Sequence, residues 1–545
     1  MATFTSRSTL LCAVVLCTFI CNVVAGGPDN AGTSFVIPAF YTTYNEGVEY
    51  DDNPKLYISG LESSASINLT IAGNDDERLT FSVGEGCTIP ALMNCRLSAK
   101  SIGKTLSAIK IEADSPIAVR MHQEHLSPNM PTSFLSFPTS MLGTDYFVVD
   151  PGNVASPTEL LITAGEAGAR LDFAPSSSVD FDGRNHHKGD VLQINLGAFE
   201  TLVVRSPGYL TGTEINSDNP VSVIVGDFCS PNMQEGTLCR QPYQLLPSDR
   251  WGQRFVVTSF VTSEDSIYQI YASSDDTTVR LLGGGSEVST VLNSGESSLE
   301  TARGGSVYVV ESDKPVYILH HAENGQALTA VSADSQRVTG RTSVPVIADE
   351  TRNAEARVLI TTDCANSEGF LLDLEPLPRS KSVLRSSDGN DCVVTVPIER
   401  GNHMINHDSP DVSYSVTVYV TDDDMSYAHL ASLSTDSGNS DSNPLQGAGA
   451  KGVRSFQTRL KATSGLLLKW KPPASWPGEP MGYRIQIKSV DDRAFCQCRN
   501  VVIHNPRRTS FWLRNLSADV RWVVGVRPFG SLGSGEVTLR IVRTA

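Results

Sequence analysis

The sequence predicts an all-β fold of tandem antiparallel β-sandwich-like repeats, followed by one further β-sandwich near the C-terminal end. Apolar and polar residues alternate in short segments from Ser34 onward, and Gly, Pro, Asn, Asp or Ser bounds each segment. A similar order of segments recurs at intervals of about a hundred residues, which is the size of a small sandwich and not of a solenoid repeat. No long segment has helical periodicity. A β-propeller, whose blades have similar strand counts, is the alternative architecture.

Residues 1–25 have the features of a secretory signal peptide. Arg7 is followed by an apolar run from Leu10 to Val24, and the small residue Ala25 ends it. The run is shorter than the roughly 20 residues that a membrane span needs. We therefore expect cleavage after Ala25 and a secreted, extracellular chain without a membrane span.

Two motifs recur in the segments that follow. An opening strand is expected at residues 67–71, 159–163, 267–271 and 357–361. An Asp-x-Pro sequence followed by a strand begins at Asp114, Asp218 and Asp313. We expect each proline to start its strand, because it has no N–H to give to a ladder.

These motifs divide the chain into four β-repeat units. The expected bounds are 26–150, 151–260, 261–347 and 348–433. The fourth unit has residues 409–414 in place of Asp-x-Pro, and a terminal unit is often atypical.

A resemblance to a known family rests on separated motifs that occur in order. They are Gly32-Thr-Ser-Phe-Val36, Pro131-Thr-Ser-Phe-Leu135, and Pro138-Thr-Ser-x-Leu-Gly followed by Tyr146. Residues 34–433 thereby resemble the N-terminal region of the IgG Fc-binding protein family, whose members include a secreted mucus component. The resemblance implies an extracellular binding or adhesion region. Immunoglobulin as the ligand does not follow from it, because no contact residue is assigned.

Cysteine spacing predicts disulfides and an oxidising compartment. Three of the 11 cysteines precede residue 26, so an even number remains in the mature chain. Cys496 and Cys498 are too closely spaced for a relaxed disulfide in an extended strand, and they are candidates for pairing with another chain. The remaining six form local pairs, each closing a loop of its own unit: Cys87 with Cys95, Cys229 with Cys239, and Cys364 with Cys392.

Two sequons make the chain a candidate glycoprotein. Asn68 begins Asn-Leu-Thr and Asn515 begins Asn-Leu-Ser. Secretion would make both sites available to the glycosylation machinery.

The C-terminal residues form a separate predicted domain. Residues 434–450 are rich in Ser, Gly and Asn and have almost nothing to bury, so we expect a flexible linker. Residues 451–545 resemble a fibronectin type III domain, with Trp470 as the core tryptophan and Tyr483 opening the next strand. Trp522 stands where the family usually has the corner tyrosine. We expect the corner to differ, or to use the indole N–H.

Charge divides the chain into an acidic body and a basic domain. The whole chain carries −17, yet residues 451–545 contain 17 Lys and Arg against 5 Asp and Glu. We expect this domain to dock on a sulfated or acidic polysaccharide through charges that salt would screen. Nucleic acid is not expected as a partner of a secreted chain. The candidate patch consists of Arg499, Arg507, Arg508, Arg514 and Arg521.

No catalytic or metal-binding pattern stands out. His122 and His320 follow equivalent strands of different units, whereas a metal site needs three or four converging ligands. His-Glu-x-x-His and Gly-x-Ser-x-Gly do not occur, and the acidic clusters lack the order of a calcium loop. We therefore predict a protein that is not an enzyme and that uses no cofactor and no metal.

The favoured function is that of a secreted binding or adhesion protein for an extracellular protein or glycan. One alternative is a structural matrix or mucus component cross-linked between chains through Cys496 and Cys498. A carbohydrate-active enzyme is the other, since two catalytic carboxylates can lie far apart in sequence.

Overall fold

The computed structural model describes most of the chain. The described residues are 31–38, 55–61, 64–72, 77–84, 88–92, 102–123, 132–151, 157–181, 183–227, 241–322, 327–347, 354–422, 426–435, 452–462, 465–476, 479–489, 499–514, 516–518, 520–530, 533–534 and 538–544. The predicted signal peptide and most of the predicted linker lie outside these residues. Within them, no helix has the length and apolar character needed to cross a membrane.

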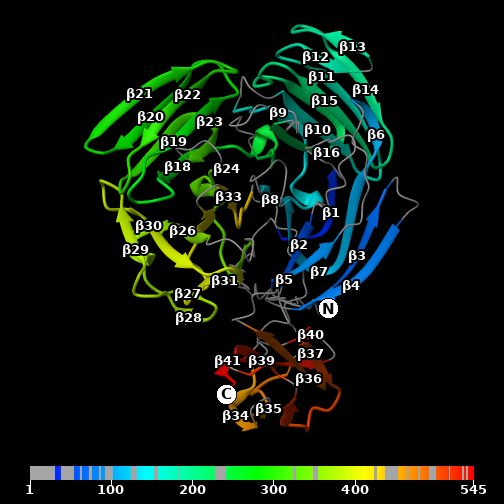
Figure 1. Ribbon diagram of the computed structural model, residues 1–545, viewed down its shortest axis with the longest axis vertical. Helices are drawn as coiled ribbons and strands as arrows, with labels where there is room; N and C mark the ends of the chain where they lie inside the picture. Colours follow the sequence, from blue (N-terminus) through cyan, green and yellow to red (C-terminus); the bar gives the residue numbers. More distant parts are fainter. Residues whose placement is uncertain are drawn as a thin grey trace, which may run out of the picture.

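Four groups of strands surround a common centre, and a smaller sandwich lies beside this ring (Figure 1). Every sheet is antiparallel, which confirms the predicted all-β fold of repeated units with a C-terminal sandwich. The units follow one another round the ring in chain order, so the fourth lies beside the first (Figure 1). In the alternative architecture, a β-propeller, the units are likewise arranged round a centre.

The first two sheets are formed as follows. The first has the order β4 (Glu77–Val83), β3 (Ala65–Ile71), β7 (Ala108–Gln123), β2 (Lys55–Gly60), β5 (Thr88–Leu92), with β1 (Gly32–Pro38) and β8 (Thr132–Ser136) also on β7. The second has the order β13 (Arg184–His186), β12 (Val179–Phe181), β15 (Glu200–Ser206), β10 (Thr158–Ala164), β16 (Glu214–Asp227), β11 (Ala169–Ala174), β14 (Leu192–Leu196). The second sheet also contains β9 (Gly143–Phe147), β17 (Tyr243–Gln244) and β6 (Gly103–Leu106).

The other two units contain three sheets. The third unit has the order β21 (Ser286–Leu292), β20 (Thr277–Gly283), β23 (Val307–Ala322), β19 (Ser266–Ala272), β22 (Ser297–Ala302), with β18 (Gly252–Thr258) and β24 (Leu328–Ala330) on β23. The fourth unit has one sheet of β25 (Thr342–Val346), β31 (Gly401–His407), β27 (Phe370–Leu372), β28 (Glu375–Pro376) and another of β29 (Ser382–Arg385), β30 (Asp391–Ile398), β26 (Glu355–Asp363), β32 (Ser415–Thr421), β33 (Ser426–Leu430).

A long strand organises each of the first three units, and the Asp-x-Pro sequence lies inside it. In the pairing of β7 with β1, the paired residue of β7 jumps from Glu112 to Ile117, so the residues between have no partner in β1. The pairing of β16 with β9 and of β23 with β18 is interrupted in the same way. The expectation that proline starts the strand is therefore wrong. Proline is tolerated within the strand because it lies at the irregularity, where no ladder hydrogen bond is lost.

The aspartate of the motif makes the same hydrogen bond in each unit. Asp114 accepts from the backbone N–H of Ser66, Asp218 from that of Arg170, and Asp313 from that of Thr278, at 2.7 to 2.8 Å. The motif thus fastens the bend of the long strand to its neighbour. In the fourth unit, which lacks the motif, the long strand is split into β31 and β32.

One predicted opening strand is assigned wrongly. Residues 67–71 lie in β3, which pairs with the first half of β7 as β11 pairs with β16. The counterpart of β10, β19 and β26 is β2, which pairs with the second half of β7. Both strands alternate in the same way, so the sequence pattern does not separate them.

The motif from Pro138 to Gly143 both ends one sheet and begins the next. A 3-10 turn, η1 (Thr139–Met141), follows Pro138, and η2 (Ser248–Arg250) and η3 (Asp334–Gln336) stand at equivalent places. A Cβ on Gly32 would lie 2.3 Å from Pro138 Cβ, and one on Gly143 would lie 2.6 Å from Pro247 Cβ. Only glycine allows this approach. After this motif, β9 and β18 join the second and third sheets eight to nine residues before the unit bounds expected above, and β6 of the second sheet lies well within the expected first unit.

Apolar cores join three of the four junctions in the ring. Leu161, Val203 and Ile224 of the second unit pack into the core of the first. Tyr317 and Leu319 of the third pack against the second. A further cluster joins the third and fourth units: Val256, Phe260, Val307, Ala322, Ala327, Leu359, Val393, Tyr419 and Ala428.

The junction between the fourth and first units, here called the seam, is held by polar contacts. Thr88 Oγ1 donates to Asn402 Oδ1 at 2.7 Å, and Ser343 Oγ lies 2.9 Å from Ser59 Oγ. Arg120 Nη2 donates to the carbonyl oxygens of Ser343 at 2.6 Å and Ala431 at 2.7 Å. These bonds join residues more than 200 positions apart and close the ring.

The side chain of Gln241 occupies the centre of the ring. Its Nε2 lies within hydrogen-bond distance of the carbonyl oxygens of Ser133 (3.2 Å), Ala428 (2.6 Å) and Leu328. These three residues lie in β8, β33 and β24, the innermost strands of the other three units. One buried amide group thereby links all four units.

The C-terminal domain is a sandwich of two sheets. One has the order β34 (Arg454–Ala462), β35 (Gly465–Lys471), β38 (Ser510–Leu513), and the other consists of β37 (Arg499–Ile503), β36 (Pro480–Ser489), β39 (Arg521–Gly530), β40 (Gly533–Ser534) and β41 (Thr538–Arg543). Trp470 and Tyr483 are buried between the sheets, with ring centroids 5.1 Å apart. The indole N–H of Trp522 donates to Thr544 Oγ1 at 3.4 Å, which agrees with the expected use of the indole at this corner.

One predicted disulfide lies within the described residues. Cys364, at the start of η4 (Cys364–Asn366), is bonded to Cys392 of β30 and ties the start of this turn to the sheet. Cys87, Cys95, Cys229, Cys239, Cys496 and Cys498 lie outside the described residues, and their pairing stays a prediction.

We expect Asp313→Ala to lower the free energy of unfolding by about 1 kcal/mol, because it removes a charge-assisted bond to the Thr278 N–H at a partly exposed site. Denaturant unfolding measures the change. Asp411→Ala, at an exposed position, serves as the control. An equal effect of the two substitutions would contradict the role given to the motif.

We expect Gln241→Leu to destabilise the ring by about 3 kcal/mol or more, because it leaves buried carbonyl groups of three units without a donor. Thermal unfolding of the full chain measures this effect. Gln253→Leu is the matched control, since the Gln253 amide donates to the Asp313 carbonyl at an exposed site. A stability like that of the control would show that the centre tolerates these unpaired groups.

Candidate functional site

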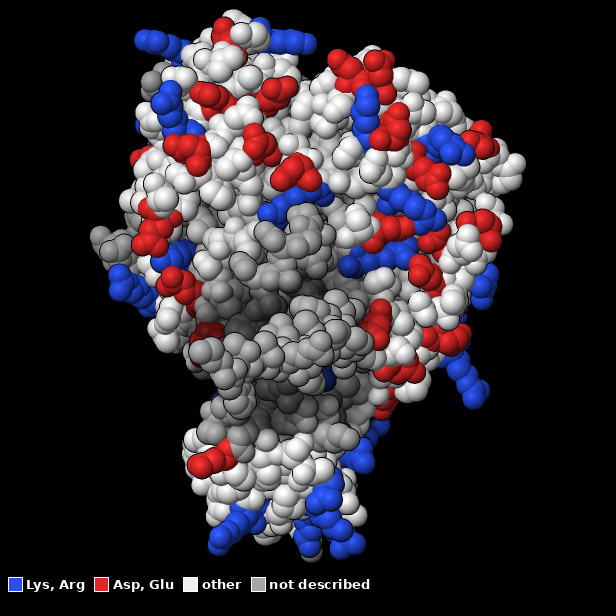
Figure 2. Space-filling view, turned by 180° about the vertical axis from the view of Figure 1, so that it is seen from behind, with Lys and Arg blue, Asp and Glu red and all other residues white. Residues whose placement is uncertain are grey.

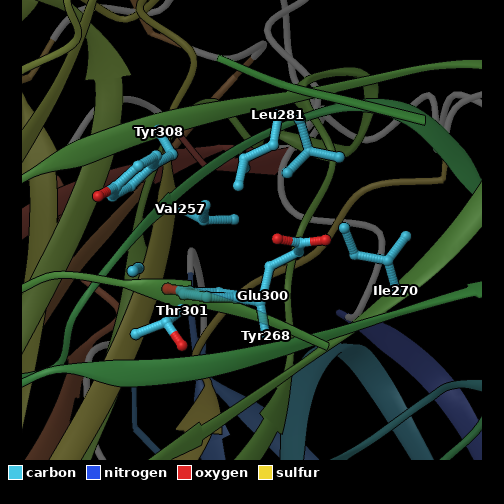
Figure 3. Close-up of a pocket in the computed structure, with 9 residues that line it drawn as sticks. Val257, Tyr268, Ile270, Leu281, Glu300, Thr301 and Tyr308 are labelled. Carbon is cyan, nitrogen blue, oxygen red and sulfur yellow. The ribbon is translucent and has the colours of Figure 1, made fainter. Parts of the chain in front are cut away.

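A pocket in the third unit lies between the two halves of its sheet. Figure 3 shows the Glu300 carboxylate directed between Leu281 and Ile270, with Tyr268 and Tyr308 nearby. Ser298 Oγ donates to Glu300 Oε1 at 2.6 Å. The walls leave no space for a water molecule, and Glu300 is the one carboxylate among the lining residues. This arrangement supplies neither the room nor the second carboxylate that glycoside hydrolysis requires.

The tyrosine of this pocket has a packing role. The Tyr268 hydroxyl donates to the Thr258 carbonyl oxygen and lies 3.2 Å from His320 Nδ1. The His320 ring is stacked between Tyr268 and Phe260. Burial raises the pKa of Tyr268 far above its ordinary value and, with the neighbouring His321, lowers the pKa of His320 well below its own. Both groups are therefore neutral over the ordinary pH range.

The other histidines named from the sequence do not converge with His320. His122 is buried between the rings of Tyr57 and Tyr427, at centroid distances of 5.8 Å. His125 lies outside the described residues. Within the described part of the chain, no three His, Cys, Asp or Glu side chains are placed to hold a metal ion.

Strand β22 forms an uncovered edge of the third sheet. Its counterparts are β5, β15 and β30, because each of the four pairs with the second strand of its own unit. An added strand covers two of them: β6 pairs with β15, and β29 pairs with β30, whereas β5 ends its sheet among the described residues. Among the described residues, no strand pairs with β22 on its outer side. Glu300 points inward from this strand, which is a common protection of an edge against unspecific pairing.

Exposed apolar side chains gather in the same unit. Leu299, on β22, is 67% exposed, and its neighbour across the strand pair is Gln269. Val288 and Val291 on β21 are 47% and 58% exposed, and Ile267 on β19 is 37% exposed. The third unit thus presents apolar side chains to solvent at both edges of its sheet, with Leu299 and Ile267 at the β22 edge, and such side chains mark interaction surfaces.

One sheet of the C-terminal domain, together with the arginines that flank β38, is here called the basic face; its strands carry five basic residues, and the strands of the other sheet carry seven. Residues directly opposite each other in paired strands point to the same face of a sheet. Arg459 is opposite Leu467, and Leu467 is opposite Trp512, so these three side chains lie on one face. Lys469 and Lys471 are exposed on the strand between, where they alternate with buried Leu468 and Trp470. Strands β34, β35 and β38 contain no Asp or Glu.

Two arginines of the basic face lie over aromatic rings. The Arg514 guanidinium lies 4.7 Å from the centroid of Trp512, which is itself 47% exposed, and Arg508 lies 5.4 Å from that of Phe511. Figure 2 shows Lys and Arg side chains at the lower end of this domain, while both signs of charge mix over the ring. An exposed indole beside cations suits a sugar ring that carries anionic groups.

The predicted patch of five arginines is divided in the structure. Arg507 and Arg508 lie exposed in the turn before β38, and Arg514 lies just after it. Arg521 lies on the opposite sheet, with its Nη1 3.9 Å from Glu375 Oε2 of the fourth unit. The Arg499 side chain lies outside what the structure describes. The predicted patch does not include Arg459, Lys469 and Lys471, although their alternation with apolar residues places them on one outer face.

The two sequons differ in what the structure describes. Asn68 is exposed on β3, and its Oδ1 accepts a hydrogen bond from Thr80 Oγ1 of β4 at 3.1 Å. Asn515 lies outside the described residues. Glycosylation at both sites stays a prediction.

Solved structures similar to part of the chain are fibronectin type III domains. The third fibronectin III domain of a human protein matches 20% of this chain and 93% of its own length, with 17% identity and a TM-score of 0.18. The FN3 domain of human collagen XX matches 17% of this chain and 91% of its own length, with 23% identity and a TM-score of 0.15.

The ring matches a known family in sequence. The human IgGFc-binding protein is 29% identical over 273 residues, which are 49% of this chain and 5% of that protein, so the chain spans a small part of its relative's length. The family model described as IgGFc binding protein matches residues 132–420, from the last strand of the first unit nearly to the end of β32. This match covers more than half of the sequence, and the chain therefore belongs to the IgGFc-binding protein family.

Proposed function

We propose that this chain is a secreted extracellular binding protein without catalytic activity, in which edge strand β22 holds a segment of a protein partner. The single observation that carries the proposal is that none of the described strands pairs with the outer side of β22, beside the 67% exposed Leu299, within the family-matched residues. Extracellular placement is supported by the predicted signal peptide and by the Cys364–Cys392 bond, since such bonds persist in oxidising compartments.

The partner segment would add one strand to the third sheet. Strands β6 and β29 illustrate the geometry, because each covers the equivalent edge with four paired residues. Main-chain hydrogen bonds would supply affinity, and the exposed side chains of Leu299 and Ile267 would supply selectivity. An extended segment with apolar residues at alternate positions fits this edge.

Charge narrows the choice of partner further. The acidic residues of the chain lie mostly before the C-terminal domain, so the ring is strongly negative. Long-range attraction therefore favours a partner segment flanked by Lys or Arg. The name of the human relative states the Fc region of IgG as its ligand, and Fc is accordingly the first protein to test.

The basic face supports a second interaction, with a sulfated or acidic glycan. Arg459, Lys469, Lys471 and Arg514 would contact the anionic groups, and Trp512 would stack on a sugar ring. Such a contact would hold the chain in mucus or matrix while the ring binds its partner. Arg521 is not included, because it faces Glu375.

We expect Leu299→Lys to weaken binding of the IgG Fc fragment at least tenfold, because a lysine on the edge opposes strand addition. Biolayer interferometry with the full chain measures the affinity. Val291→Lys is the matched control, since Val291 is similarly exposed on the other edge of the same sheet. Absence of Fc binding by the wild type would exclude Fc as the ligand, and equal loss in both variants would contradict the choice of β22.

We expect a triple substitution of Arg459, Lys469 and Arg514 to Ala to lower the NaCl concentration at which the chain leaves a heparin column. The variant loses three cations from one face, so fewer counterions are released when it binds heparin, and less salt is needed to elute it. A triple substitution of Arg484, Arg540 and Arg543 to Ala removes the same charge from the opposite sheet. An equal shift for both would indicate net charge alone and would contradict a localised glycan site.

A further inference from the structure

The seam differs from the other junctions at one equivalent position. This position lies on the long strand of each unit, opposite the innermost strand. It is Arg120 in the first unit, paired with Leu135; Ile224 in the second, paired with Gln244; and Leu319 in the third, paired with Ala330. Ile224 and Leu319 belong to the apolar clusters that join the second unit to the first and the third to the second. Arg120 instead brings a cation to the junction of the first and fourth units.

Arg120 is fully buried, and no carboxylate of the described residues pairs with it. Its side chain is 0% exposed, and Nη2 alone is hydrogen-bonded, to the carbonyl oxygens of Ser343 and Ala431. Nε and Nη1 have no hydrogen-bond partner. Burial lowers the pKa of Arg120 to about 9, so the guanidinium remains charged at neutral pH. An isolated buried charge is costly unless a counter-charge accompanies it.

Other groups of the seam are also left without partners. Both ring nitrogens of His429, on β33, have no hydrogen-bond partner, and the same holds for Ser432 Oγ, next to the carbonyl that Arg120 contacts. His429 lies two residues before Ala431, whose carbonyl accepts from Arg120. Burial, and then the charges of Arg120 and His122, lower the pKa of His429 well below its ordinary value. The seam therefore gathers a fixed positive charge and several unused hydrogen-bond donors.

We propose that the seam binds a small monovalent anion of the chloride class between Arg120 of the first unit and His429 and Ser432 of the fourth. The anion would accept from Arg120 Nε and Nη1 and from the neutral His429 and Ser432 side chains. Water could satisfy these donors, but it would leave the charge uncompensated. A monovalent ion matches the single charge of Arg120, and full burial of Arg120, His429 and Ser432 favours a small one. Closure of the ring would then depend on the anion.

Thermal unfolding of the full chain in sodium chloride and in sodium gluconate at equal ionic strength tests the proposal. We expect a higher midpoint in chloride, and above the dissociation constant each tenfold rise in chloride raises the folded-to-unfolded ratio about tenfold. Arg120→Met should abolish the difference between the two salts. The double variant Glu159→Gln with Arg205→Met should retain it, because Arg205 has its own carboxylate at 2.6 Å. Equal midpoints of the wild type in the two salts, or a retained difference in Arg120→Met, would overturn the proposal.

A second measurement uses the native chain, in case Arg120→Met fails to fold. Crystals of the wild type grown in sodium bromide should show an anomalous-scattering peak in contact with the Arg120 guanidinium. A seam without such a peak, in crystals that show bromide elsewhere, would overturn the assignment.

Discussion

The ring depends on how its innermost strands satisfy their backbone groups at the centre. Strands β8, β24 and β33 turn carbonyl oxygens toward a space where no further strand can pair, and buried carbonyls need donors. The Gln241 amide of the second unit has two N–H groups, and its Nε2 lies within hydrogen-bond distance of a carbonyl oxygen from each of these three strands. One side chain thus contacts the innermost strands of the other three units at the same point.

Neighbouring units of the ring are held together by two kinds of contact. Apolar clusters join the units that are adjacent in sequence, and their strength comes from area removed from water. The seam joins units that are far apart in sequence, and it relies on Arg120 and a chain of hydroxyl and amide groups from Ser59 to Asn402. Polar contacts are directional and gain little net free energy, so the seam specifies where the ring closes more than it stabilises it.

Much of the local structure could be predicted from the sequence, and most of the assembly could not. Alternation revealed the strands, and repetition revealed Asp-x-Pro, but the place of the proline inside a long strand depends on a register jump that no local pattern encodes. Closure depends on pairs such as Thr88 with Asn402, which local patterns do not connect. For the proposed glycan site, charge counting indicated the C-terminal domain, and that site stays a prediction. Charge counting also assigned Arg521 to the patch, because the ion pair with Glu375 arises only from the placement of the domain beside the ring.

The position of β6 affects how the molecule can be divided. This strand follows the first sheet's β5 in the chain but completes the edge of the second sheet on β15. The first two units are therefore interlocked, and neither is a self-contained module. A fragment that begins at residue 132, where the family match begins, would lack β6 and leave residues 200–203 of β15 without a partner on that side. A fragment that contains the ring must therefore include residues 103–106; without them, an unpaired strand edge is exposed.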